Sequence, residues 1–430
     1  MSRQAAYQAR FPALVENTLF SRLPEQQQSF LAHQAERFQF SHQELRQLAE
    51  IALDLNMWQT GDITTLWPDE AALTAQGKQR RRQLLGLLVT RWEALRAAPN
   101  RYRPTSIRRI GAAAIPIEKT KGRLGLGYCP VASPKTRCCN LLTLDAVDNC
   151  GYGCSYCSIQ SFYDGKEISF DRDFARKLAT LEIDPNQTYH IGTGQSSDSL
   201  MWGNSHGVLE ALLKFARRHP NVILEFKTKS ANVKYLLEHP LPANVICTWS
   251  LNTPTIIEHE EHGTAPLHKR LAAARAIADK GGLVGFHFHP MVHYDHWRDD
   301  YRAVIDQLVN RFSPQEVALV SLGTLTFIKP VMRQIRERGI ETQILKMPLT
   351  DAEGKLSYPD DIKLELFRHA YDHFPEQWKN GVFFYLCMEH QRFWKPVFGF
   401  EWESNKAFEE AMKTAYRKKI AAAQRHTEGA

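Results

Sequence analysis

The segment LLTLDAVDNCGYGCSYC, residues 141–157, joins a short apolar run to three closely spaced cysteines. The run LLTLDAV is typical of a buried strand. Cys150, Cys154 and Cys157 follow it at C-x3-C-x2-C spacing, with glycines, tyrosines and a serine between them. We therefore expect three thiols on a loop directly after a strand.

Similar apolar runs recur further along the chain, at residues 188–194, 222–228, 244–251, 283–291 and 317–325. Amphipathic helical patterns separate these runs. Strand–helix alternation of this kind predicts a parallel sheet with right-handed crossovers. Six such units predict an α/β fold with a partial TIM-type (β/α)6 barrel. In barrels of this type the chemistry lies at the carboxyl ends of the strands, which is where the cysteine loop falls.

The pattern divides the chain into four parts. Residues 1–98 form an N-terminal helical region, in which Ser41 and Glu44 have the spacing of a capping box. Residues 99–137 are rich in Pro, Gly and Arg and form a basic linker. The barrel is expected over residues 138–330, and residues 331–430 are expected to form a C-terminal α/β extension.

The composition is that of a globular protein, with 43% apolar and 23% charged residues. No apolar run reaches the roughly 18 residues that a membrane span needs. The first residues also lack the continuous apolar segment of a secretion signal. We therefore expect a cytoplasmic protein with no membrane partner. In that compartment, eight cysteines favour metal binding or catalysis over disulfides.

The net charge is +7, and basic residues are densest between Lys78 and Arg109. This stretch is either a solvated helix followed by a charged linker, or a surface that contacts the phosphates of a nucleic acid. The sequence leaves both interpretations open.

Three thiolates at the spacing of the cysteine loop can converge on one soft metal centre. A structural zinc site needs four closed ligands, and a cubic iron–sulfur cluster usually takes four cysteines. Three cysteines leave one iron of such a cluster open to a substrate or cofactor. Zinc remains an alternative if Cys138, Cys139 or a histidine supplies a fourth ligand, and unliganded loop thiols are the third interpretation.

A C-x3-C-x2-C loop after the first strand of a parallel barrel resembles the radical S-adenosylmethionine (SAM) enzymes. The resemblance implies a [4Fe-4S] cluster on Cys150, Cys154 and Cys157 with SAM bound to its open iron. It also implies reductive cleavage of SAM to a radical that abstracts a hydrogen atom, and hence an electron donor of the flavodoxin or ferredoxin type. In such enzymes the cofactor carries the hard chemistry and the protein orients it.

A narrower resemblance is carried by LEFKTKS (224–230), WSLN (249–252) and EEHGTAPLHKRLAAARAIADKGG (260–282). These segments are similar to spore photoproduct lyase, which reverses a thymine–thymine lesion in DNA, and the similarity covers roughly residues 138–325. It implies a nucleic acid as partner. It also implies a SAM pocket and a catalytic tyrosine; the pocket residues are Ser197, Lys227, Ser250 and Asn252, and the tyrosine is Tyr156.

Two positions depart from the lyase pattern. The lyases have a hydrogen-donating cysteine just ahead of their Ser-Asp pair, where this chain has Gln195, and a second loop tyrosine, where this chain has Ser158. An amide cannot donate a hydrogen atom as a thiol does. We therefore expect a different hydrogen relay and inefficient repair of the spore lesion by the lyase route. Cys387, in VFFYLCMEH, is either a small core residue or a substitute donor.

The run GFHFHPMVHYDHW places His287 and His289 on one face of a strand. If Phe286 and Phe288 pack under the helices, both histidines point into the barrel. They are then either satisfied interior residues that can hydrogen-bond to a substrate, or part of a second metal site with neighbouring histidines.

Three functions stay open on the sequence. The first is a radical SAM enzyme that acts on nucleic acid, and the second is a radical SAM enzyme that acts on a peptide or small molecule. The third is a zinc-stabilised protein that binds nucleic acid without catalysis.

Overall fold

A computed structural model describes residues 3–102, 116–120, 122, 124, 126–129, 135–159 and 167–428. The chain forms two compact units. The first contains residues 1–103 and 327–350, and the second contains residues 104–326 and 351–430. Residues 327–350, which follow the last predicted barrel strand, therefore group with the N-terminal helices.

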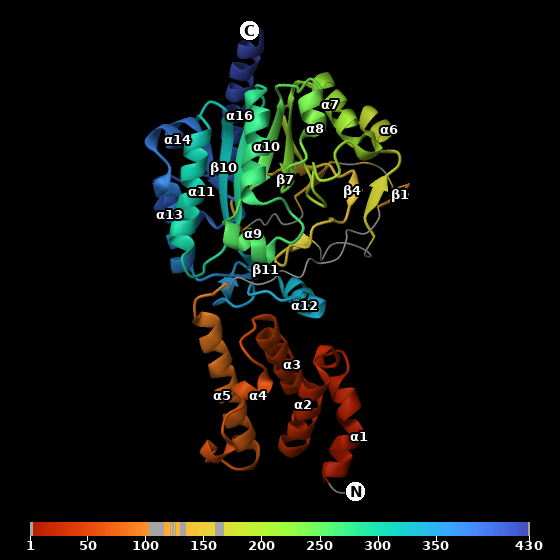
Figure 1. Ribbon diagram of the computed structural model, residues 1–430, viewed down its shortest axis with the longest axis vertical. Coiled ribbons are helices and arrows are strands. Elements are labelled where there is room, and N and C mark those ends of the chain that lie inside the picture. The colour runs from red at the N-terminus through yellow and green to blue at the C-terminus, as the bar shows by residue number, and fades with distance from the viewer. Residues whose placement is uncertain are drawn as a thin grey trace. The chain divides into compact units, whose positions relative to one another are not determined.

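The first unit is helical (Figure 1), and its helices are α1 (Arg3–Val15), α2 (Glu25–Phe38), α3 (His42–Met57), α4 (Ile63–Leu66), α5 (Gly77–Ala97) and α12 (Lys329–Arg338), with 3-10 turns at Phe20–Arg22 and Glu70–Ala72. Ser41 caps α3 with both bonds of the capping box, which confirms that prediction. Arg336 of α12 donates two hydrogen bonds to the buried carboxylate of Asp54, at 2.8 and 2.9 Å. This bidentate pair ties the 327–350 segment to α3.

Several arginines of the basic stretch form ion pairs or hydrogen bonds within this unit. Arg81 pairs with Glu44 at 3.2 Å, Arg91 donates to the carbonyl of Leu66, and Arg96 donates to the carbonyl of Met347. These contacts support a structural role for much of α5. Arg103, Arg108 and Arg109, which complete the basic stretch, lie outside the described residues.

An eight-stranded sheet forms the centre of the second unit, in the order β14-β10-β9-β8-β7-β6-β3-β2. Every neighbouring pair is parallel except β2 with β3. The strands are β2 (Gly127–Tyr128), β3 (Leu142–Thr143), β6 (Tyr189–Thr193), β7 (Val222–Thr228), β8 (Val245–Ser250), β9 (Leu283–Met291), β10 (Val317–Thr324) and β14 (Phe383–Leu386). The curled parallel sheet confirms the predicted α/β partial barrel. The sequence did not predict β14, because an apolar run this short cannot be told from a buried helix segment.

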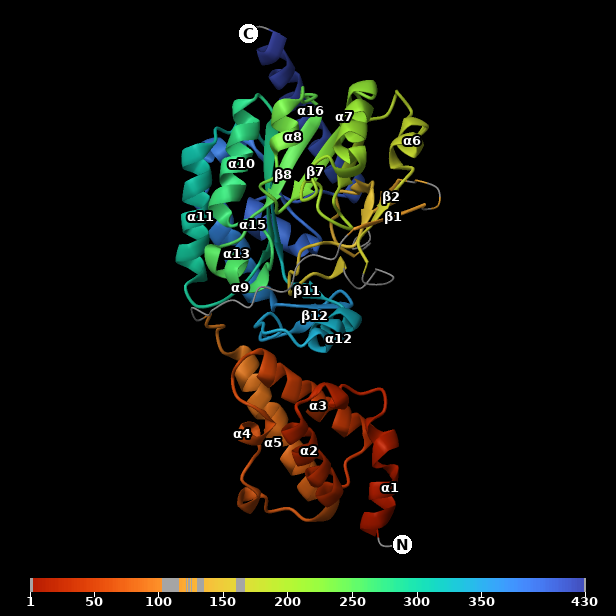
Figure 2. The same cartoon turned by 45° about the vertical axis from the view of Figure 1, so that its right-hand side comes forward.

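Helices cover both faces of this sheet (Figures 1 and 2). The helices of the unit are α6 (Phe174–Ala179), α7 (Val208–Arg218), α8 (Lys234–Glu238), α9 (Pro254–Glu260), α10 (Leu267–Asp279), α11 (Trp297–Arg311), α13 (Asp360–His373), α14 (Glu376–Gly381), α15 (Trp394–Phe398) and α16 (Asn405–Glu428), with 3-10 turns at Ser205–Gly207 and Gln391–Phe393. Within the described part of the chain, no helix has both the length and the apolar character to cross a bilayer.

The two faces of the sheet carry different side chains, with phenylalanines on one face and histidines on the other. Phe286 stacks edge-on against Phe312 at the end of α11, and Phe288 contacts Tyr301 of α11. On the opposite face, His190 of β6 contacts Tyr416 of α16. Because side chains alternate along a strand, His287 and His289 share the face opposite to α11, which confirms that they point to the inner side of the half-barrel.

Two small sheets complete the strands. One has the order β1-β5-β4, with β1 (Ile117–Lys119), β4 (Val147–Asp148) and β5 (Ser169–Asp171), and the other has the order β11-β13-β12, with β11 (Thr326–Phe327), β12 (Thr350–Ala352) and β13 (Lys355–Ser357). Strand β4 leads into the cysteine loop and pairs antiparallel with β5, which follows it. This pairing fixes both ends of the loop.

Candidate functional site

The cysteine loop starts at the end of β4, so it follows a strand as predicted. The single barrel strand predicted over residues 141–147 is wrong, because the run is divided between β3 of the barrel sheet and β4 of the small β1-β5-β4 sheet. Cys150 and Cys157 are partly exposed, and Cys154 is buried. Burial raises the pKa of Cys150, and the charges of Asp198 and of the other two thiols add to this effect. Burial also raises the pKa of Cys154 to about 12, although Lys229 opposes the shift. The three thiols are therefore near one another, and a positive centre among them would relieve the cost of ionising them.

The segment after α9 braces this loop through its backbone. The backbone N–H of Gly153 donates to the carbonyl of His262, and that of Ser155 donates to the carbonyl of Glu260, both at 2.9 Å. The Ser155 hydroxyl also donates to the carboxylate of Glu260. Glu260 and His262, which belong to the segment 260–282 that resembles the lyases, therefore hold the cysteine loop in place through hydrogen bonds.

Tyr156 is part of the same brace. Its hydroxyl donates to the carboxylate of Glu261 at 2.5 Å, and Arg270 donates to the other oxygen of that carboxylate at 2.6 Å. Burial alone would raise the pKa of Glu261, but the charges of Arg270 and Lys229 outweigh it and hold that pKa below its usual range. The predicted catalytic tyrosine thus lies within the loop, bonded to an ionised carboxylate.

Arg270 also joins the brace to the barrel. It is fully buried, and it donates to the carbonyl of Ser250 at 2.8 Å and to the carbonyl of Ala265 at 2.7 Å. Ser250 is the last residue of β8. A single guanidinium therefore connects the end of a barrel strand to the wall of the cysteine loop, using the several donors that only Arg offers.

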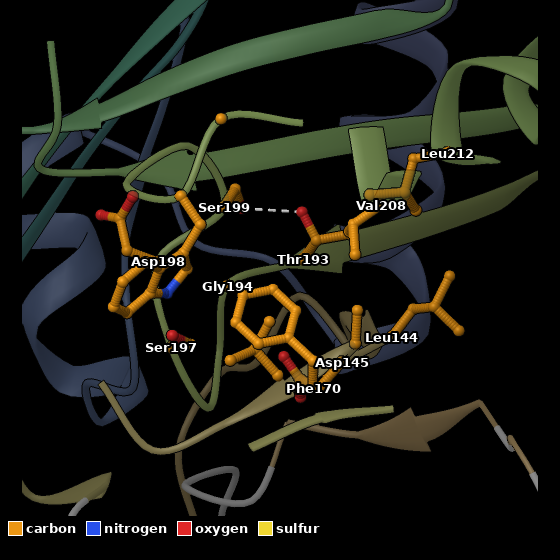
Figure 3. A pocket seen from close by; sticks show the side chains of 14 residues that line it. Leu144, Asp145, Phe170, Thr193, Gly194, Ser197, Asp198, Ser199, Val208 and Leu212 are labelled. Atoms are coloured by element: carbon orange, nitrogen blue, oxygen red, sulfur yellow. Dashed lines mark hydrogen bonds between the residues drawn. The ribbon is translucent and has the colours of Figure 1, made fainter. Parts of the chain in front are cut away.

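Ser197 lies in the loop after β6, which lines a pocket with β5 and α7 (Figure 3). Its Oγ is buried and has no hydrogen-bond partner among the described residues. The neighbouring Asp198 accepts bonds from the backbone N–H of Lys229 at 2.6 Å and from the Thr228 hydroxyl at 2.7 Å, which fixes the loop on the end of β7. A buried hydroxyl without a partner calls for an explanation, and a bound polar ligand is one.

Gly194 allows the loop after β6 to lie close to the end of β7. Its φ is +77°, and a Cβ at this position would lie 2.6 Å from Ser199 Oγ and 2.8 Å from the carbonyl oxygen of Lys227. Only glycine fits a backbone conformation of this kind with so little space. The GTGQ turn, residues 192–195, is therefore fixed against the end of β7.

Two lysines extend from the end of β7. Lys227 lies 4.0 Å from Glu225, and although burial acts to lower its pKa, the charge of Glu225 raises it above the usual range. Lys229 lies over the ring of Tyr156, with its Nζ 5.8 Å from the ring centroid. The family resemblance implied Lys227 as a pocket residue and not Lys229, yet Lys229 is the lysine beside the cysteine loop. Side chains two positions apart in an extended chain point to the same side, so the choice of Lys227 could also have indicated Lys229.

The other two predicted pocket residues have different surroundings. Ser250 is half-buried at the carboxyl end of β8, where its carbonyl binds Arg270. Asn252 is fully buried, its amide donates to the carbonyl of Pro290, and its Oδ1 accepts from the Tyr301 hydroxyl at 2.8 Å. Because these core partners use its polar atoms, Asn252 has a structural role in this conformation.

A hydrogen-bonded network crosses the inner face of the barrel. His190 and His287 donate to separate oxygens of Glu225, each at 2.8 Å. The Ser321 hydroxyl donates to Nδ1 of His287 at 2.6 Å and accepts from His289 at 3.1 Å. Burial acts to raise the pKa of Glu225, but Lys227 and the two histidines lower it well below the usual range. Burial lowers the pKa values of His287 and His289, so the network holds an anionic carboxylate and neutral imidazoles.

The donor set fits the cofactors implied by the resemblance. In the part of the chain that the structure describes, no three metal-ligating side chains are already drawn together closely enough to hold an ion. The loop nevertheless supplies three soft thiol ligands, which suit iron–sulfur chemistry. The buried Ser197 hydroxyl and the two lysines supply groups for a carboxylate or a ribose.

Comparison with known proteins agrees with this geometry. Residues 149–358 match the spore photoproduct lyase family, a span that contains the cysteine loop, its brace and both lysines. Over this span, which is just under half of its length, the chain is similar to the spore photoproduct lyases. Its N-terminal helices lie outside the matched span.

Individual relatives agree with the family match. A spore photoproduct lyase of Geobacillus sp. is 24% identical over 212 residues, which are 48% of this chain and 61% of the relative. The Bacillus subtilis lyase is 31% identical over 124 residues, 28% of this chain and 36% of the relative. The chain thus spans about three fifths or less of the curated relatives it matches.

A solved structure supports the fold. A mutant spore photoproduct lyase with bound AdoMet and dinucleoside spore photoproduct superposes with a TM-score of 0.53 at 21% identity, covering 63% of this chain and 82% of that chain. At this level of identity the likeness establishes the barrel fold.

Proposed function

We propose that this protein is a radical SAM enzyme that acts on a thymine-derived lesion in nucleic acid. The observation that carries the proposal is the three-thiol loop, braced by Glu261 and Arg270, at the carboxyl edge of a parallel half-barrel. When bound, a [4Fe-4S] cluster and SAM supply a carbon radical that abstracts a hydrogen atom from the substrate.

Each group of the site has a part in this proposal. Cys150, Cys154 and Cys157 hold the cluster, and Ser197 and Lys229 bind polar groups of SAM. The brace holds the loop in place and limits the entry of water, which protects a radical from side reactions. Cluster reduction requires a one-electron donor of the flavodoxin or ferredoxin type.

The charge of the barrel interior supports an anionic substrate. Lys227 lies near Glu225 on the inner face of β7, and Lys229, just past the end of that strand, lies over the ring of Tyr156. Two cations in a partly desolvated site favour a phosphodiester over a neutral ligand. Binding to nucleic acid should therefore weaken as salt concentration rises.

The test is anaerobic reconstitution with iron and sulfide, followed by reaction with SAM and dinucleoside spore photoproduct. The expected result is a brown protein that forms 5′-deoxyadenosine and releases the thymine dinucleotide. A reconstituted protein that cleaves SAM without converting the lesion would assign the radical chemistry to another substrate. A colourless protein that retains one zinc per chain would overturn the proposal in favour of a structural metal site.

A further inference from the structure

Four of the eight cysteines gather away from the cysteine loop, and we name Cys129, Cys138, Cys139 and Cys387 the interior thiol group. The backbone N–H of Cys129 donates to the carbonyl of Leu141, and that of Arg137 donates to the carbonyl of Glu389, both at 3.0 Å. Residues 137–141 therefore connect the end of β2 with the end of β14.

Within this group, Cys138 and Cys139 share a side-chain hydrogen bond, and Cys139 lies near Cys387. Cys129, Cys139 and Cys387 are partly exposed, whereas Cys138 is buried. None of these thiols is joined in a disulfide. The group is therefore a set of reduced sulfur atoms, some of them accessible.

Cys387 lies at the carboxyl end of a barrel strand. Its backbone N–H donates to the carbonyl of Leu322 on β10 at 2.8 Å. A Cβ on Gly323 would lie 3.5 Å from the carbonyl oxygen of Cys387 and 3.1 Å from the His289 ring, so Cys387 is a neighbour of the inner-face network. Lys227 belongs to the same network, because it lies 4.0 Å from Glu225, which accepts a hydrogen bond from His287. The thiol group and the proposed substrate cations therefore belong to the same region of the barrel.

The environment favours the protonated form of Cys387. Burial raises the pKa of this thiol well above its usual range, and the charge of Cys139 adds to the effect. A nucleophilic or metal-binding cysteine needs the thiolate, which this site disfavours. A hydrogen-atom donor needs the opposite, an intact S–H bond. That bond is weaker than an ordinary C–H bond, so transfer of its hydrogen atom to a carbon radical is favourable.

We propose that Cys387 donates the hydrogen atom that quenches the product radical, which rests on the proposed function. In this step the S–H bond of Cys387 breaks, a C–H bond forms on the product, and a thiyl radical remains on Cys387. One electron from the low-potential donor that reduces the cluster, together with one proton from solvent, restores the thiol. Gln195 cannot perform this step, because an N–H bond of an amide is too strong.

The first test asks whether Cys387 lies where the dinucleoside binds, and it requires no enzymatic turnover. The full-length protein is treated with a maleimide in the presence and absence of dinucleoside spore photoproduct, and labelling of each cysteine is followed by mass spectrometry. With the ligand at ten times its Kd, labelling of Cys387 should slow about tenfold, because about nine in ten sites are occupied. Cys247, a fully buried core residue, should stay unlabelled throughout and reports that the protein is folded. An unchanged labelling rate at Cys387 would overturn the proposal.

The second test follows the hydrogen atom. Thiol hydrogens exchange with solvent, so the reconstituted wild type in D2O should place deuterium in the product. Cys387→Ser keeps the size of the side chain but removes the weak S–H bond. This variant should still form 5′-deoxyadenosine and consume the lesion, while the deuterated product is lost and adducts accumulate. Cys247→Ala is the matched control and should behave as wild type.

The outcomes separate the two proposals. Full deuterium incorporation by Cys387→Ser would overturn the assignment of Cys387, even with SAM cleavage intact. A wild-type protein that cleaves no SAM would refute the proposed function instead. In that case the maleimide labelling still decides whether Cys387 lies where the dinucleotide binds.

Discussion

Tyr156 donates its phenolic hydrogen bond to Glu261, a buried carboxylate that is held ionised by Arg270. The three side chains come from the cysteine loop, the end of α9 and the first turns of α10. Because the side chains of Glu261 and Arg270 are fully buried, solvent does not screen their charges, and the hydrogen bond from Tyr156 couples the cysteine loop to this ion pair.

Replacing Arg270 should therefore destabilise the protein strongly. Arg270→Met leaves the carboxylate of Glu261 buried without its cation, which should cost roughly 3–5 kcal/mol in the free energy of unfolding. Urea denaturation measures this loss. Arg302→Ala, which removes an exposed pair with Asp306, should change stability by less than about 1 kcal/mol. Equal losses in the two variants would contradict the role of the buried pair.

A double variant tests whether the unpaired charge on Glu261 causes this loss of stability. Glu261→Gln combined with Arg270→Met removes both charges, so it should recover part of the stability that Arg270→Met loses. A double variant less stable than Arg270→Met would show that the charge left on Glu261 is not the cause.

Each cysteine of the loop should be needed for the cluster. Cys150→Ala, Cys154→Ala or Cys157→Ala should each abolish the brown colour and the iron content of the reconstituted protein, because a cluster loses one of only three protein ligands. Iron and sulfide analysis with a visible spectrum checks this. Cys247→Ala, which changes a core thiol, should keep both. Retention of colour and SAM cleavage in all three loop variants would contradict the assignment.

Lys227 of β7 and Lys229, just past the end of that strand, should differ in their effect on SAM binding. Losing a charge-assisted hydrogen bond costs roughly 1.5–3 kcal/mol, about ten- to a hundredfold in affinity. We expect this loss in Lys229→Ala, because Lys229 lies beside the loop, and we test Lys227→Ala alongside it as the residue that the sequence indicated. Equilibrium dialysis with SAM on cluster-loaded protein gives both affinities.

The control for these lysines is an exposed one. Lys234→Ala on α8 removes the same charge at a side chain that is 81% exposed, and SAM affinity should not change. If Lys229→Ala also left the affinity unchanged with the cluster intact, Lys229 would be removed from the proposed pocket.

Stability should fall as the pH falls below about 6.5. Burial lowers the native pKa values of His287 and His289, so the unfolded chain binds protons near its ordinary value of about 6.5 while the native protein does not. Between that value and the lower native pKa, each histidine reduces the free energy of unfolding by about 1.4 kcal/mol per pH unit. Urea denaturation at pH 7.5, 6.5 and 5.5 measures the slope.

A single substitution tests the source of this slope. His289→Gln removes one of the two titrating groups and should flatten the loss between pH 6.5 and 5.5. His268→Gln on the exposed face of α10 is the matched control. An unchanged slope in His289→Gln would assign the pH dependence to other groups.

A thiol placed at Gln195 should partly replace Cys387. In the Cys387→Ser background, Gln195→Cys introduces a thiol at the position where the lyases carry their donor, so deuterium from D2O should return to the product. Gln195→Ala in the same background supplies no hydrogen atom and should not restore it. Restoration by both variants would mean that loss of the amide, and not the new thiol, explains the effect.

The local features of this protein could be predicted from its sequence. Strand–helix alternation predicted the partial barrel, and the bounds of β7 and β9 match the predicted runs, because periodic apolar residues report burial directly. The spacing of Cys150, Cys154 and Cys157 indicated the thiol loop, and the positions of Ser41 and Glu44 indicated the cap of α3. Each of these signals lies within a few neighbouring residues.

The contacts between distant residues depend on the tertiary structure. No local pattern joins Tyr156 to Glu261 and Arg270, or brings the residues after β14 to the segment that carries Cys138 and Cys139, because packing between elements far apart in the sequence creates these contacts. The same packing occupies the polar atoms of Asn252 with core partners and places Lys229 beside the loop. Side-chain roles of this kind depend on long-range contacts, which a sequence specifies only through the complete fold.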